Sequence, residues 1–119
     1  MKLFLKRYIN KFYYAFAGLF DGFLHDRSIL TQYLIGIFVI TVCFFFHLKI
    51  WEWIVIVTFI CLVIAMEYLN SALETITDKI SPEYSLEAKK IKDYSAAAVL
   101  VVSIAAAIVG ILILGSKLI

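Results

Sequence analysis

Three long apolar runs, separated by polar segments, dominate the hydrophobic pattern of this chain. They cover about residues 32–48, 51–70 and 95–114, and each is near the roughly 20 residues that a helix needs to cross a bilayer. Lipid forces such runs to be helical, because the backbone must satisfy its own hydrogen bonds there. The pattern therefore predicts three membrane-spanning helices, the first two joined by a tight turn at residues 47–52.

The opening segment, residues 1–30, has a different pattern. Apolar residues such as Phe4, Tyr8 and Phe12 recur at helical spacing, with Lys6 and Arg7 between them. This pattern predicts an amphipathic helix lying on the membrane surface, although a simple anchor without chemistry would produce it too. We therefore expect residues 1–119 to form one all-α membrane domain, with a surface helix followed by three spanning helices.

Composition and charge agree with a membrane location and suggest an orientation. The chain is 64% hydrophobic, and its net charge of +2 is too small to indicate a nucleic-acid partner. The basic residues gather in two places, before the first span and in the second connection, residues 79–93, whereas the first connection has only Lys49. Because basic residues favour the cytoplasmic side, we expect the N-terminus and the second connection to be cytoplasmic.

A row of polar side chains marks the end of the second span. At about 100° per residue, Glu74 and Asp78 fall about 20° on either side of Glu67, and Asn70 and Ser71 lie on the same face. A carboxylate at the end of an apolar run is costly, so Glu67 is a functional candidate. Asp78, taken alone, is better explained as a solvated acid where the helix leaves the membrane.

A lysine and a further acid, Lys92 and Asp93, precede the third span. Carboxylates and a lysine at a membrane surface are a minimum set for phosphoryl transfer, because acids can hold Mg²⁺ and a cation can neutralise the moving phosphate. The same residues could line an ion path in an oligomeric channel or transporter subunit. Against that alternative, the outer half of the second span has no polar lane except Thr58.

The run E-Y-L-N-S-A-L-E at residues 67–74, with Asp78, a segment S-P-E-Y at residues 81–84 and the later Lys92-Asp93 pair, resembles the prokaryotic diacylglycerol kinase and undecaprenol kinase family. The resemblance covers nearly the whole chain. It implies a homotrimer with active sites shared between subunits, in the cytoplasmic membrane of a bacterium. It also implies that the protein uses ATP with Mg²⁺ to phosphorylate a lipid alcohol, either diacylglycerol or undecaprenol.

The resemblance also implies roles for individual residues. Glu67 resembles the catalytic base, Asn70 a group that orients the site, and Lys92 a group that stabilises developing charge. Asp26 and Glu74 resemble the metal ligands, although the family usually has Glu where this chain has Asp26, and Ser85 stands where histidine is common. The implied ATP-binding residues are Arg7, Tyr14, Asp26, Glu74, Glu83, Tyr84, Ser85, Lys92 and Asp93.

Overall fold

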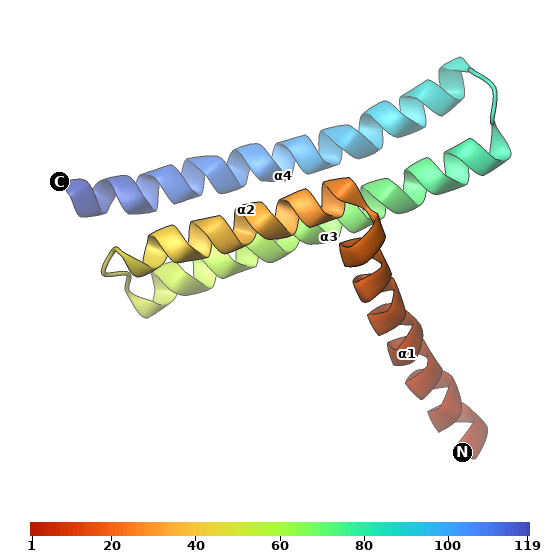
Figure 1. Cartoon of the computed structure of the whole chain (residues 1–119), viewed down its shortest axis with the longest axis horizontal. Coiled ribbons are helices and arrows are strands. Elements are labelled where there is room, and N and C mark those ends of the chain that lie inside the picture. The colour runs from red at the N-terminus through yellow and green to blue at the C-terminus, as the bar shows by residue number, and fades with distance from the viewer.

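The computed structural model describes all 119 residues as four helices joined by short loops. The helices are α1 (Lys2–His25), α2 (Arg27–Phe44), α3 (Ile50–Ile80) and α4 (Leu86–Leu118). In Figure 1, α3 and α4 run antiparallel, α2 lies along the first part of α3, and α1 projects away from the other three. Three of the helices, α2, α3 and α4, are long and apolar enough to cross a membrane. The predicted all-α fold, a surface helix followed by three spanning helices, is confirmed.

The second connection is much shorter than the predicted 79–93, because both helices beside it extend into that range. Only Ser81–Ser85 lies outside a helix. Pro82 ends α3, since proline lacks the backbone N–H that a helix needs and disfavours helical geometry in the residue before it. Ser85 then starts α4, because its hydroxyl accepts a hydrogen bond from the backbone N–H of Ala88 at 3.0 Å. Lys92 and Asp93 are therefore on a helix and not in a loop.

The other two boundaries also differ from the sequence prediction. The opening helix ends at His25, short of residue 30, because the Asp26 carboxylate caps α2 by accepting a hydrogen bond from Ile29 N–H at 3.0 Å. The first turn occupies residues 45–49, so α3 already begins at Ile50. Both α3 and α4 are longer than α2, and they continue past the junction of α1 and α2 (Figure 1). We call this part of α3 and α4, with its loop Ser81–Ser85, the polar end.

The outside of the helices is apolar, and little of the chain is buried. Only 12 of the 119 residues are buried, and large hydrophobic side chains on all four helices point outward. A helix that is apolar all round is typical of a membrane span, because lipid covers the side chains. A small cluster of buried side chains, Cys43, Ile56 and Ile113, joins α2, α3 and α4 away from the polar end. Both cysteines are free: Cys43 is buried and Cys61 is exposed.

An ion pair fastens α3 to α4 at the end of the bundle opposite the polar end. Lys117 Nζ lies 2.6 Å from Glu52 Oε1, and the carboxylate side chain is only 5% exposed. Glu52 also accepts a hydrogen bond from the backbone N–H of Lys49 at 2.8 Å, which caps the start of α3. A buried charge of this kind depends on its partner.

Changing Lys117 to Met is therefore expected to lower the thermal unfolding midpoint in detergent by several degrees, because a nearly buried carboxylate loses its counter-ion. The double variant Glu52→Gln, Lys117→Met removes both charges and should recover part of the loss. A double variant as unstable as the sum of the two single variants would contradict a direct interaction.

Candidate functional site

Glu67 lies on α3 at the level of the junction between α1 and α2, and it is held from two helices. Its side chain is buried, with the residue only 5% exposed. Gln32 of α2 donates a hydrogen bond from Nε2 to Glu67 Oε2 at 3.4 Å, and Asn70 donates from Nδ2 to Oε1 at 3.5 Å. Each carboxylate oxygen thus has one amide donor, which fixes the orientation of the group without neutralising it.

Gln32 was not among the site residues predicted from the sequence. It stood at the edge of the first apolar run, and only the packing of α2 on α3 brings it to Glu67. A polar residue at the start of a spanning segment could have indicated such a contact, since polar residues in these segments usually face a partner inside the protein.

Asn70 has one group that the chain leaves without a partner. Its carbonyl oxygen, Oδ1, is buried and accepts no hydrogen bond. An unsatisfied buried acceptor costs about 1–3 kcal/mol, and most native ones have an explanation. The position of this atom beside Glu67 suits a donor supplied by a bound molecule or by a second chain.

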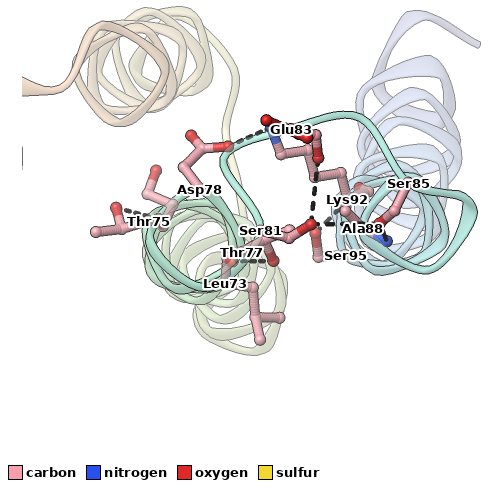
Figure 2. Close-up of polar contacts among 11 residues, drawn as sticks. Leu73, Thr75, Thr77, Asp78, Ser81, Glu83, Ser85, Ala88, Lys92 and Ser95 are labelled. Carbon is pink, nitrogen blue, oxygen red and sulfur yellow. Dashed lines mark hydrogen bonds and ion pairs between the residues drawn. The ribbon is translucent and has the colours of Figure 1, made fainter.

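At the polar end, Lys92 of α4 pairs with Asp78 of α3. Lys92 Nζ lies 2.5 Å from Asp78 Oδ1, and Figure 2 shows the two side chains facing each other across the space between the helices. The hydrogen bond to Asp78 raises the pKa of Lys92 above its usual value, and the negative charges of Asp78 and Glu74 add to the effect. Asp78 is mostly exposed, as expected of an acid where the helix leaves the membrane, but it is also paired, because α4 runs back alongside α3 and brings Lys92 to it.

A cavity of about 250 Å³ opens beside this pair and takes in the loop Ser81–Ser85. The Ser81 hydroxyl donates to the Glu83 carbonyl at 3.2 Å, which holds the loop in shape (Figure 2). Asp93 is paired on its own helix with Lys89, at 2.6 Å. Five of the predicted ATP-binding residues therefore come together around one cavity, namely Glu83, Tyr84, Ser85, Lys92 and Asp93.

The predicted site residues of α1 do not join this cavity within one chain. Arg7 and Tyr14 are exposed residues of α1, the helix that projects away from the other three (Figure 1). Asp26 lies at the junction of α1 and α2, where Oδ1 is occupied by the N–H of Ile29. Its role as a helix cap is a structural function that the sequence analysis did not assign.

A metal site made by the protein alone is absent, since no group of three or more His, Cys, Asp or Glu residues comes together. Mg²⁺ bound with a nucleotide does not require one, because it is typically held by one or two carboxylates together with phosphate oxygens and water. Glu74 fits this requirement: it is exposed on the same face of α3 as Glu67, and its charge reaches Lys92. Asp26 fits it less well, because one of its oxygens already caps α2.

The ion pair of Asp78 and Lys92 predicts a pH dependence of stability. Because the folded pKa of Lys92 is raised above 10.5, the pair stabilises the fold below pH 10.5 and loses this effect as the pH rises through the raised pKa. The stability difference between the wild type and Asp78→Asn should therefore be constant between about pH 7 and about pH 9 and shrink above about pH 11. Thermal unfolding in detergent would measure it, and a difference that persists at high pH would contradict the prediction. We expect a small difference, since the pair is partly exposed.

The fold and the site together define a small all-α membrane protein with carboxylates and a lysine at one end of its spanning helices. A family model described as prokaryotic diacylglycerol kinase matches residues 13–114. The chain is 39% identical over 100 residues to a diacylglycerol kinase of Synechocystis, a match covering 83% of this chain and 57% of the relative. This chain thus spans little more than half the length of that relative.

Two further relatives match over most of their length. An undecaprenol kinase of Bacillus subtilis is 31% identical over 114 residues, covering 96% of this chain and 93% of the relative. A diacylglycerol kinase of Haemophilus influenzae is 33% identical over 107 residues, covering 90% and 88%. The chain belongs to the prokaryotic diacylglycerol kinase family, a family of lipid kinases. The predicted family and enzyme class are confirmed.

Proposed function

We propose that this protein transfers the terminal phosphoryl group of ATP to the hydroxyl of a membrane lipid alcohol, at the cytoplasmic face of a bacterial inner membrane. The basic residues near the N-terminus and on the helices of the polar end support this orientation. The observation that carries the proposal is the carboxylate of Glu67, buried and held by two amides at the level where the surface helix meets the spanning helices. A lipid alcohol places its hydroxyl at the membrane interface, where an amphipathic helix such as α1 is expected to lie.

In this proposal, Glu67 is the general base. Its carboxylate accepts the proton of the lipid hydroxyl as the oxygen attacks phosphorus, while Gln32 and Asn70 hold the carboxylate in place. Lys92 carries a positive charge at neutral pH and neutralises charge that develops on the phosphoryl oxygens. Catalysis in phosphoryl transfer comes mainly from positioning and electrostatics of this kind.

An apolar groove in the protein is evidence in favour of a lipid as the phosphoryl acceptor. It has a volume of about 660 Å³, lies between α2, α3 and α4, and is lined mostly by hydrophobic side chains. Gln32 lines it and also donates to Glu67, so the groove opens beside the proposed base. A hydrocarbon chain in this groove would leave its hydroxyl near Glu67.

The protein is proposed to act as a homotrimer with sites shared between subunits. Glu67 and Asp78, the partner of Lys92, are separated by roughly 16 Å along α3 at about 1.5 Å per residue. One chain therefore keeps its proposed base and its proposed phosphate-binding lysine apart, and neither Arg7 nor Tyr14 of the same chain lines the cavity. A neighbouring chain could supply the missing groups to each site.

Mg²⁺ is the proposed cofactor, bound together with the nucleotide. Glu74 is the better of the two expected ligands, because its carboxylate is exposed and close enough to Lys92 to affect its pKa. Bound Mg²⁺ would supply charge neutralisation for the phosphates of ATP.

The decisive experiment offers the purified protein labelled ATP and Mg²⁺ with diacylglycerol and undecaprenol side by side in mixed micelles. We expect label in the lipid fraction with at least one alcohol, and the ratio of kcat/KM between the two would identify the substrate. No transfer to either alcohol, together with cation flux in proteoliposomes without nucleotide, would overturn the proposal in favour of a channel or transporter.

A further inference from the structure

The hydroxyl of Tyr68 joins three helices at one point. Tyr68, on α3, donates a hydrogen bond to the backbone carbonyl of Leu19 on α1 at 2.6 Å. The hydroxyl of Tyr33, on α2, lies 2.9 Å from the same Tyr68 oxygen. Because a carbonyl can only accept, the single proton of Tyr68 goes to Leu19, and Tyr33 must be the donor in the second bond. The direction of both hydrogen bonds is thereby defined.

The backbone of α1 comes unusually close to the Tyr68 ring. Gly22 is the only buried residue of α1, and a Cβ added to it would approach Tyr68 Cε1 so closely that the Tyr68 ring or one of the two helices would have to move. The carbonyl of Gly22 also accepts the N–H of Asp26 at 3.0 Å, which ends α1. Any side chain at position 22 would therefore disturb the place where α1 is attached.

The rest of α1 has little to hold it. Figure 1 shows that the N-terminal part of α1 projects away from the bundle, and most residues of the helix are exposed. The edge-to-face contact of Phe23 with Tyr33 is at the same attached end. The direction of α1 is thus set mainly by the last turns of the helix, where Leu19, Gly22 and Phe23 meet α2 and α3.

We propose that Tyr68 is a positioning residue, whose hydroxyl holds α1 at a set angle to the Glu67 face of α3. Tyr68 follows Glu67 directly in α3, so the attachment of α1 and the proposed base share one stretch of backbone. Tyr14 and Asp26, which the sequence resemblance implies to contact the nucleotide, are carried by α1 and by its end. The inference rests on that proposed function for its effect on catalysis, but the attachment itself is a property of the fold.

The test compares Tyr68→Phe with the wild type by two independent measurements. The substitution keeps the ring and removes only the hydroxyl. Spin labels at positions 12 and 80, in a background without cysteine and diluted with unlabelled chain, report the distance between α1 and the end of α3. We expect a narrow distribution in the wild type and a broad one in Tyr68→Phe. In assays, KM for MgATP should rise about fivefold, which corresponds to about 1 kcal/mol, with kcat changed less than about twofold.

Two matched controls accompany the test. Tyr13→Phe removes a hydroxyl from an exposed tyrosine that makes no hydrogen bond, and Gly18→Ala adds a methyl group where a Cβ meets nothing within 4 Å. Both should keep the narrow distribution. Gly22→Ala, one helical turn from Gly18, should broaden it, because the added Cβ displaces Tyr68.

Each outcome decides a separate point. An unchanged distribution in Tyr68→Phe would overturn the positioning role, and so would a broad distribution with an unchanged KM for MgATP. If the wild type phosphorylates neither lipid alcohol, the proposed function fails, whereas the distance measurement still tests whether Tyr68 holds α1.

Discussion

Changing Glu67 to Gln is expected to reduce lipid phosphorylation by about 10²–10⁴-fold, the usual contribution of a general base. Glutamine has the same shape but cannot accept the proton of the lipid hydroxyl. The loss should fall on kcat, while KM for MgATP stays nearly constant, because the nucleotide cavity lies at the polar end, away from Glu67. Initial rates with labelled ATP and a saturating lipid alcohol would measure both constants.

The fold should survive this substitution. The wild-type carboxylate accepts only two long hydrogen bonds, at 3.4 and 3.5 Å, so little stability is lost with it. Size-exclusion chromatography and circular dichroism in detergent would show whether the variant keeps the elution volume and the helix content of the wild type. Glu87→Gln, which removes an exposed carboxylate from the first turn of α4, is the matched control and should keep full activity. Wild-type turnover in Glu67→Gln would exclude Glu67 as the base.

Changing Lys92 to Met should lower kcat by about 10²–10³-fold, comparable to the loss of one preorganised electrostatic group in other active sites. Methionine keeps much of the length and apolar stem of lysine but carries no charge. Unlike Glu67→Gln, this change should also raise KM for MgATP, because Lys92 lines the cavity and its charge would attract the phosphates.

The stability cost of Lys92→Met should be small, because Asp78, which loses its partner, is mostly exposed. Lys90→Met is the matched control: Lys90 is exposed on the same helix and forms no ion pair. If Lys92→Met and Lys90→Met show the same rates, Lys92 has no part in the reaction.

Much of the fold could be predicted from the pattern of apolar residues. The three runs led to three spanning helices because lipid leaves a backbone few alternatives to a helix. The boundaries were less accurate, since they depend on single side chains. Asp26 and Ser85 each cap a helix earlier than the polar pattern suggested, and hydropathy carries no information on capping.

The candidate site, too, has a part that could be predicted from the sequence and a part that could not. The face shared by Glu67, Asn70 and Glu74 follows from helical spacing within one segment, so it could be predicted. The pairing of Asp78 with Lys92, the contact of Gln32 with Glu67 and the attachment of α1 through Tyr68 each join different helices. Their spacing along the chain has no fixed relation to distance in space.

The sequence by itself determined that this is a membrane protein, which helices span the bilayer, and which polar residues are too costly there to lack a purpose. The resemblance of its motif also identified the family. Only the tertiary structure decided which side chains meet, because that depends on how α2 and α4 pack against α3 and where α1 is attached. The reason is physical: helix formation depends on neighbours along the chain, whereas a site depends on contacts between segments that are distant in it.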